Sequence, residues 1–292
     1  MHNYLVSIGM PVYNCEGTMG RALDSLLAQT HDNLEIFVSD NYSTDRTYEI
    51  CREYEKKDSR VSVCRNKSNV GIIENFRIVL QKARGEFFMW AAGDDCWKPK
   101  FLEALINQMA ENPEAGTALC AVRREYPGGT LKDVIRFDEE IGDKPQSALR
   151  TASRLLSPLK KTKMLKYNLF ICGLFRRRIA EGILDKNPEI LDLGERPFLA
   201  LVALSSGFVF VNRKLFVKMV YRTRFKERKQ GDSYKKNFDP FRYYLDTAVH
   251  ILRAGSIPIQ RKVFVVAVMR YALEILLSRA KKKAKAFLEM GE

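Results

Sequence analysis

The stretch Phe87-Phe88-Met89-Trp90-Ala91-Ala92-Gly93-Asp94-Asp95 runs six apolar residues directly into a glycine and two adjacent carboxylates. A continuous apolar run that ends at a glycine is typical of a strand buried on both faces, as in a parallel sheet covered by helices. Gly93 lets the chain turn sharply where it leaves the sheet. We therefore expect Asp94 and Asp95 at the carboxyl end of this strand, the edge at which open α/β sheets bind ligands.

The two neighbouring carboxylates are a candidate metal site. Asp94 and Asp95 repel each other, so a site that holds both gains stability from a cation placed between them. Hard divalent cations such as Mg²⁺ and Mn²⁺ prefer carboxylate oxygens and often bridge to substrate phosphates. The alternative is a plain Gly-Asp-Asp turn ahead of a helix that begins near Pro99, a residue favoured in the first helical turn.

Strand-like and helix-like segments alternate along the first 124 residues. The expected strands are residues 4–10, 34–39, 61–64, 87–92 and 117–122. Apolar residues at helical spacing follow each of the first four strands. The first expected helix ends at about Gln29. The other three begin after a cap at Ser43 or Thr44, at Ile72 and at Pro99. Such alternation calls for parallel strands joined by right-handed crossovers. The expected fold class is α/β, with a mostly parallel, Rossmann-like sheet and helices on both faces.

The loops that follow the first four expected strands are polar. They are residues 11–14, 40–45, 66–71 and 93–95. Because the carboxyl ends of parallel strands share one edge of the sheet, we expect these loops to converge on one site. The sequence has no G-x-G-x-x-G after the first strand and no G-x-x-x-x-G-K-S/T anywhere. A dinucleotide or triphosphate is therefore not expected to be held by a glycine-rich loop.

The net charge of +14 is concentrated in the second half of the chain. Residues 1–146 carry 18 Lys and Arg against 23 Asp and Glu, a net of −5, so residues 147–292 carry +19. Such an excess predicts contact with phosphates, an anionic membrane surface or nucleic acid, unless it is a solvated charge run. No segment reaches the ~18 uncharged apolar residues expected of a membrane span. Six scattered cysteines without a C-x-x-C pair, and only three histidines, indicate a reduced cytosolic protein without a zinc site.

Four segments together resemble family 2 glycosyltransferases of the GT-A fold. They are residues 6–14 (VSIGMPVYN), 39–45 (SDNYSTD), 69–71 (NVG) with Asn75, and 93–95 (GDD), in the order and at the spacing of that family over residues 4 to about 110. The resemblance implies an inverting transferase that uses a nucleotide-sugar donor and a divalent metal, Mg²⁺ or Mn²⁺. It becomes looser between Gly173 and Arg222 and is absent beyond.

The resemblance also implies roles for individual residues. Donor binding would fall to Pro11, Tyr13, Asn14, Asp40, Asn69, Asp94 and Arg222. Pro11 and Tyr13 would line the base pocket, and Asp40 would read the edge of the base. Asp94 would touch the ribose, and Asp95 would ligate the metal on the diphosphate with Asp94 beside it. This DXD-like motif has Ala92 where many members have an aspartate. The plainer alternatives are a turn-forming Asp40, a surface aromatic ring at Tyr13, and turn and helix-surface positions for Asn69 and Asn75.

Inverting transfer also needs a base that deprotonates the acceptor hydroxyl. Residues 193–199 (LGERPFL) resemble the segment of the family that supplies it, with a glutamate where aspartate is commoner. We therefore expect Glu195 to be the base, with Asp192 as the second candidate. The alternative is that Glu195 only favours a helix N-terminus. Arg222 lies near the position where members often have a histidine, and it would neutralise phosphate unless it belongs to a solvated basic loop.

In the second half of the chain we expect a helix that begins at residues 198–204, a strand at 208–211 and two helices around 240–253 and 259–279. These expectations divide the chain into a GT-A domain at 1–235, with a nucleotide-sugar half at 1–124 and an acceptor half at 125–235, and a basic helical extension at 236–292. The expected activity moves a sugar from a nucleotide-diphospho-sugar to a sugar or lipid-linked acceptor, in polysaccharide, O-antigen or glycolipid assembly. A small pocket with Asp40 and Tyr13 favours a UDP-sugar. The protein is expected in the cytoplasm, with its basic half held to the inner face of an anionic membrane.

Two other functions compete with this interpretation. A sugar-phosphate nucleotidyltransferase also pairs carboxylates with a metal on an α/β sheet, but it usually has a glycine- and basic-rich loop after the first strand, which residues 11–17 lack. A basic nucleic-acid-binding protein would account for the charge. The acidic N-terminal half and the absence of a recognition motif argue against it, so no nucleic-acid partner is expected.

Overall fold

The computed structural model describes residues 2–136, 169–220 and 240–253, together with the single positions 152, 262, 266 and 269. Its first half alternates strands and helices: β1 (Val6–Val12), α1 (Glu16–Leu27), β2 (Leu34–Asp40), α2 (Thr47–Lys57), β3 (Val61–Arg65), α3 (Ile72–Gln81) and β4 (Phe87–Trp90). The four strands are parallel and lie in the order β3-β2-β1-β4. The order therefore reverses between β1 and β4, and such a reversal is the switch point where these sheets bind ligands.

The second half adds antiparallel strands to this sheet. Its elements are β5 (Cys96–Trp97), α4 (Phe101–Glu111), β6 (Thr117–Glu125), β7 (Leu131–Ile135), the 3₁₀ helix η1 (Leu169–Cys172), β8 (Leu174–Arg176), α7 (Arg177–Lys186), the 3₁₀ helix η2 (Ile190–Leu193), α8 (Glu195–Ser206), β9 (Phe208–Met219) and α10 (Pro240–Arg253). The order continues β4-β8-β6-β9-β5, with β7 paired to β6. β6 and β9 are parallel, whereas β8 is antiparallel to both β4 and β6.

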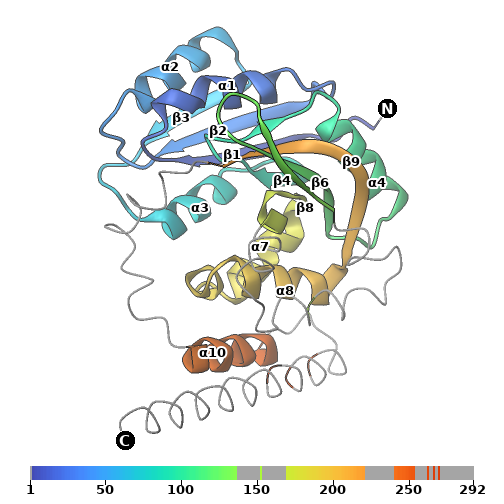
Figure 1. Ribbon diagram of the computed structural model, residues 1–292. Coiled ribbons are helices and arrows are strands. Elements are labelled where there is room, and N and C mark those ends of the chain that lie inside the picture. The colour runs from blue at the N-terminus through green and yellow to red at the C-terminus, as the bar shows by residue number, and fades with distance from the viewer. Residues whose placement is uncertain are drawn as a thin grey trace, which may run out of the picture.

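Helices flank both faces of the sheet, so the expected α/β fold is confirmed. In Figure 1, α1 and α2 lie over one face, and α3, α7 and α8 lie over the other. The α10 helix lies beyond α8, away from the sheet (Figure 1). Among the described residues, no helix combines the length and the apolar character needed to cross a bilayer.

Trp90 is the centre of the aromatic packing beneath the carboxylates. Its ring makes edge-on contacts with Phe88, Phe175 and Phe198, with ring centroids 4.7, 5.5 and 5.6 Å away. Its indole N–H donates to the backbone carbonyl of Phe76 at 3.0 Å, so the one polar atom of the ring is satisfied. Because these partners lie on β4, β8, α8 and α3, Trp90 fixes the end of β4 against both halves of the chain.

The longest strand, β9, returns the chain to the edge where Asp95 lies. It first pairs with β6 in parallel and then pairs with β5 in antiparallel register, with Cys96 opposite Val217 and Trp97 opposite Phe216. Continuing that register by one residue places Asp95 opposite Lys218. A strand that begins in the second half of the chain therefore completes the site of the first half.

Several strands differ from the expectation. β1 extends through Pro11 and Val12, because both pair with β2, so the loop begins at Tyr13 rather than at residue 11. The stretch at residues 87–92 leaves the sheet after Trp90. β5 and β7 were not expected, and β9 continues to Met219 rather than ending at Val211.

Neither Ser43 nor Thr44 caps α2, contrary to the expectation. The helix begins at Thr47 after Arg46, whose side chain makes no capping bond. Asp45 caps the helix instead, because its carboxylate accepts hydrogen bonds from the Thr47 backbone N–H at 3.0 Å and from the Thr47 hydroxyl at 2.5 Å. Ser43 and Thr44 bond to a neighbouring loop instead.

The remaining expectations concern the second half of the chain. The helix expected around residue 198 begins at Glu195, and the expected helix at Pro240–Arg253 is confirmed as α10. Arg222, the basic segment around it, most of the second expected C-terminal helix and the basic tail lie outside the described residues. The division into domains stays a prediction.

We expect Gly85→Ala to lower the free energy of unfolding by about 1–3 kcal/mol, the usual cost of overpacking. A Cβ at Gly85 would lie 2.8 Å from the backbone nitrogen of Ser7 on β1, so the strand would have to move. Gly182→Ala in α7 is the matched control, because nothing lies within 4 Å of the added methyl group and alanine favours a helix. Urea unfolding of both variants measures the effect. A Gly85→Ala midpoint equal to that of the unmodified protein would contradict this close packing.

Candidate active site

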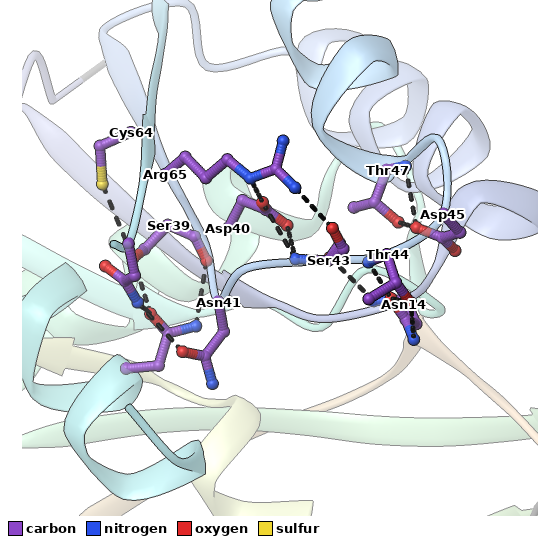
Figure 2. Close-up of polar contacts among 12 residues, drawn as sticks. Asn14, Ser39, Asp40, Asn41, Ser43, Thr44, Asp45, Thr47, Cys64 and Arg65 are labelled. Atoms are coloured by element: carbon purple, nitrogen blue, oxygen red, sulfur yellow. Dashed lines mark hydrogen bonds and ion pairs between the residues drawn. The ribbon is translucent and has the colours of Figure 1, made fainter. Parts of the chain in front are cut away.

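Asn14 ties the loop after β1 to the loop after β2 (Figure 2). Its φ of +48° lies in the left-handed region, which asparagine tolerates better than most residues. Its backbone N–H donates to the Ser43 hydroxyl at 3.0 Å, and its side-chain carbonyl accepts from the Thr44 N–H at 2.9 Å. The structure thus shows how Asn14 holds the two loops together, while its contact with a donor stays a prediction.

Asparagine amides join the loop after β2 to the loop after β3. Asn41 donates to the side-chain carbonyl of Asn69 at 2.9 Å and accepts from the Asn66 amide at 3.1 Å. Asn75 was expected either on the helix surface or at a ligand, but it is buried. Its amide donates to the Ser39 carbonyl at 3.0 Å and its oxygen accepts from the Ser39 hydroxyl at 2.6 Å. Asn69 and Asn75 therefore hold the loops in place.

The fourth loop packs against the first. A Cβ added at Gly93 would lie 2.7 Å from the sulfur of Cys15, the residue that precedes α1. The glycine thus allows the Asp94–Asp95 turn to approach the β1 loop. The expected convergence of the four loops at the carboxyl edge is confirmed by this contact and by the hydrogen bonds among the other three.

Asp40 is fully buried at the end of β2. Figure 2 shows its contacts with Ser43 and Arg65. Its carboxylate accepts from the backbone N–H of Ser43 at 3.2 and 3.3 Å and pairs with the Arg65 guanidinium at 3.3 Å. That guanidinium lies over the rings of Tyr42 and Tyr48, at 5.3 and 4.9 Å from their centroids. These contacts match the turn-forming alternative for Asp40. Reading the edge of a base stays a prediction for this residue.

Exposed aromatic rings stand at the rim of the same edge. Tyr13 is 48% exposed and Tyr42 is 49% exposed, on the loops after β1 and β2. An exposed ring beside polar loops can stack on a planar base. Pro11 is half-buried and is the second-to-last residue of β1, two positions before the loop begins at Tyr13. Arg222 lies outside the described residues, so its place at this rim stays a prediction.

The two adjacent carboxylates differ in their surroundings. Asp94 is half-buried, whereas Asp95 is fully buried and accepts from the Lys218 ammonium at 2.7 Å and from the Met219 N–H at 3.3 Å. Burial raises the pKa of Asp95 to about 6; the positive charge of Lys218 opposes this rise and the negative charge of Asp94 adds to it. The pKa of Lys218 is raised: burial lowers it, but the carboxylates of Asp95 and Asp94 outweigh that effect.

Glu195 belongs to the same group of charges. It is the first residue of α8 and is half-buried, and burial raises its pKa above the ordinary glutamate value. Its own backbone N–H and the charge of Lys218 offset part of this rise. Burial likewise raises the pKa of the Cys172 thiol to about 12, and Lys218, Asp95 and Glu195 all act on that thiol. The charge of Lys218 therefore acts on Glu195 as well as on Asp95 of the predicted metal site.

Asp192 faces a different element. Its side chain is 50% exposed and pairs with the Arg77 guanidinium of α3 at 2.9 Å. Lys218, which acts on Glu195, is not among its partners in the described part of the chain. Of the two carboxylates predicted as a base, Glu195 shares the influence of Lys218 with Asp95, whereas Asp192 pairs with Arg77 of α3.

The donor set at Asp94 and Asp95 fits a hard divalent cation. Both ligands are carboxylates, and Asp95 already draws a positive charge, the Lys218 ammonium, to its buried oxygen. Within residues 2–136, 169–220 and 240–253, no group of three or more His, Cys, Asp or Glu side chains could enclose a metal. Mg²⁺ in such sites commonly takes further ligands from substrate phosphates.

The sequence missed Lys218 and Arg65 as members of this edge. Lys218 is 123 residues away from Asp95, and its place follows from the antiparallel register of β5 and β9. No local pattern could reveal that register. Arg65 carried a weak signal, because it ends the strand next to the one that ends in Asp40.

The sequence also matches known proteins. A family model described as Glycosyl transferase family 2 matches residues 7–184. The chain is 37% identical over 112 residues to the UDP-Glc:alpha-D-GlcNAc-diphosphoundecaprenol beta-1,3-glucosyltransferase WfgD of Escherichia coli. The matched region covers 38% of this chain and 44% of WfgD. Matches to curated relatives cover between 30% and 45% of the length of those proteins.

Solved structures share the fold at low sequence identity. The chain is similar to S. aureus TarS 1-349 in complex with UDP-GlcNAc, with a TM-score of 0.64, 19% identity and coverage of 91% of this chain and 71% of that one. It is also similar to the mannosyltransferase PcManGT from Pyrobaculum calidifontis in complex with GDP-Man and Mn²⁺. That match has a TM-score of 0.55 and 16% identity, and it covers 100% of this chain and 80% of that one.

Proposed function

Because this chain belongs to glycosyl transferase family 2, we propose that it moves a sugar from a nucleotide-diphospho-sugar to an acceptor hydroxyl with inversion at the anomeric carbon. The observation that carries the proposal is the ion pair of Asp95 with Lys218 at the carboxyl edge, together with the charge of Lys218 that acts on Asp94 and Glu195 as well. Two carboxylates can hold a diphosphate through a cation, while a third carboxylate with a raised pKa can take a proton. Family membership leaves a nucleotidyltransferase or a nucleic-acid-binding protein without support.

The loops after β1, β2 and β3 are the proposed donor site. Tyr13 offers an exposed ring to the base, with Pro11 and Asn14 beside it. Asp40 keeps spare lone pairs beyond those that Ser43 and Arg65 use, so it can accept a hydrogen bond from a base. We assign the remaining donor contacts to Asn69 on the loop after β3, to Asp94 and to Arg222. Asp94 would contact the ribose, and Arg222 would contact the diphosphate.

Asp95 and Asp94 would hold the divalent cation, Mg²⁺ or Mn²⁺. A cation bound there would neutralise the charge that develops on the departing diphosphate. The carboxylate donor set supports this assignment, as does the Mn²⁺ in the structure of PcManGT with GDP-Man.

Glu195 is the proposed base. Burial raises its pKa above the ordinary glutamate value, and a carboxylate with a raised pKa is a stronger base. Its place at the first turn of α8, on the second half of the chain, lets it face an acceptor that enters from that side. Glu195 would take the proton of the acceptor hydroxyl while the sugar leaves the diphosphate.

The proposed acceptor is a sugar or a lipid-linked sugar, in polysaccharide, O-antigen or glycolipid assembly. The name of WfgD, which is 37% identical over 112 residues, specifies a diphosphoundecaprenol acceptor. The net charge of +19 on residues 147–292 suits contact with an anionic membrane surface that carries such a lipid. We therefore propose a cytoplasmic protein that is peripheral on the inner face of the membrane.

We expect UDP to bind more tightly than GDP, by about 10-fold, because the small base pocket expected at Tyr13 and Asp40 suits a pyrimidine and an unmatched purine edge would cost ~1–3 kcal/mol. TarS in complex with UDP-GlcNAc supports this choice, whereas PcManGT holds GDP-Man. Thymidine diphosphate is the nearest competitor, since it is also a pyrimidine nucleotide. Calorimetric titration in the presence of Mn²⁺ measures the difference, and tighter binding of GDP would contradict it.

A panel of nucleotide sugars tests the proposed function as a whole. Each sugar is mixed with the protein and Mn²⁺, and both thermal stabilisation and release of the nucleoside diphosphate are measured. At least one UDP-sugar should stabilise the fold and be hydrolysed slowly, because water replaces the missing acceptor. If no nucleotide sugar stabilises or reacts, the proposed function is wrong.

A further inference from the structure

Lys218 is the cationic partner of the buried carboxylate at the centre of the site. Its ammonium donates to one oxygen of Asp95 at 2.7 Å, and the other oxygen accepts from the Met219 N–H. The lysine side chain is 28% exposed, whereas Asp95 has no exposed surface. Lys218 therefore lies on the side from which a ligand must reach Asp95.

The position of this ammonium conflicts with a metal on the same carboxylate. A divalent cation on Asp95 would need the oxygen that Lys218 now holds, and the two positive charges would repel each other at close range. The lysine stem is flexible and carries a compact charge, so the ammonium can leave without disturbing β9. A diphosphate beside Asp94 would give the released ammonium a new anionic partner.

We propose that Lys218 competes with the divalent cation for Asp95: its ammonium holds the cation position in the free protein and is displaced when the cation enters with a nucleoside diphosphate. The second part of this inference rests on the proposed function, and the first part does not. One consequence is that the cation and the nucleotide strengthen each other's binding. The cation alone must break the Lys218–Asp95 pair, whereas the diphosphate both ligates the cation and receives the displaced ammonium.

Direct Mn²⁺ binding tests the competition without any turnover. Free Mn²⁺ is measured by electron paramagnetic resonance during titration of the unmodified protein, of Lys218→Met and of Lys214→Met, with no nucleotide present. Lys214 is the matched control because it lies on the same strand but is exposed. Lys218→Met should bind Mn²⁺ at least about 5-fold more tightly, the low end of typical coupling between two ligands, and Lys214→Met should not change. Equal or weaker binding by Lys218→Met overturns the proposal.

A second measurement uses the unmodified protein, because Lys218→Met leaves a buried carboxylate unpaired and can impair folding. Amines are labelled with acetic anhydride, and the acetylated peptides are quantified by mass spectrometry. Mn²⁺ alone should raise the labelling of Lys218 severalfold, since the ammonium loses its partner, while Lys214 stays constant. Addition of UDP with Mn²⁺ should lower the labelling again. Labelling of Lys218 that ignores Mn²⁺ overturns the proposal.

The nucleotide arm separates this inference from the proposed function. If Mn²⁺ releases Lys218 but neither UDP nor GDP binds, the proposed function is wrong and the competition at Asp95 stands. If UDP binds and Mn²⁺ leaves Lys218 in place, the competition is wrong and the proposed function stands.

Discussion

We expect Glu195→Gln to lower the kcat of sugar transfer by ~10²-fold or more and to leave the affinity for the donor within a few-fold. Glutamine keeps the shape and the hydrogen-bonding capacity of the side chain but cannot take the proton of the acceptor. This expectation follows from the surroundings of Glu195. It is half-buried at the start of α8, burial raises its pKa, and the charge of Lys218 acts on it. Initial rates and calorimetric donor affinity, measured on the same preparations, separate kcat from binding.

Asp192→Asn is the matched control for the base. Asp192 pairs with Arg77 on α3 at the surface, so we expect transfer to stay near the rate of the unmodified protein. If Asp192→Asn instead shows the large loss and Glu195→Gln does not, the base is Asp192 and the alignment of this segment is wrong by three residues. If neither variant loses activity, the base lies elsewhere, and residues 125–166 are the next place to look.

Asp95→Asn should abolish metal-dependent transfer, a loss of about 10²-fold or more, because a neutral amide is a poor ligand for a hard cation. EDTA should inactivate the unmodified protein, and Mg²⁺ or Mn²⁺ should restore it. The fold should persist, since the Lys218 side chain already reaches solvent and can turn toward water when its partner loses charge. Circular dichroism and thermal unfolding check that point.

Asp58→Asn is the control for the loss of a carboxylate. Asp58 lies at the opposite edge of the sheet, ahead of β3, and pairs with Arg60 at 2.8 Å. This variant should keep full metal-dependent activity. Full activity of the unmodified protein in EDTA would contradict the metal role of Asp95, whatever Asp95→Asn does.

The first half of the fold and its loops could be predicted because the signals there are local. The apolar run that ends at Gly93 and the helical spacing after each strand are properties of short windows, and parallel order then sets the shared edge. The same reasoning places Asn14, Asp40 and Asp94 at one edge. It could not show that the Asp40 carboxylate is bonded to the Ser43 N–H and to the Arg65 guanidinium, because these contacts depend on how the loop folds back on itself.

The second half could be predicted less well because its elements are short or depend on distant partners. β5 has two residues, too few to show a period, and it exists because β9 pairs with it. Sequence alone ranked Glu195 above Asp192 by resemblance, and the structure adds an independent reason, the contact of Asp192 with Arg77. For Asn75 the structure does not match the expectation. A polar residue on a helix was expected at the surface or at a ligand, but Asn75 is buried and bonded to Ser39.

The distance along the chain between Asp95 and Lys218 has a consequence for synthesis. The two residues are 123 positions apart, so at ~5–20 residues per second a ribosome needs roughly 6 to 25 seconds to add the lysine after the aspartate. During that interval β9 does not exist, and β5 has no strand to pair with. The nascent first half must keep the Asp95 carboxylate hydrated, because an unpaired buried charge is costly. The edge that holds Asp95 is therefore closed only after β9 has been made, by a strand from the second half of the chain.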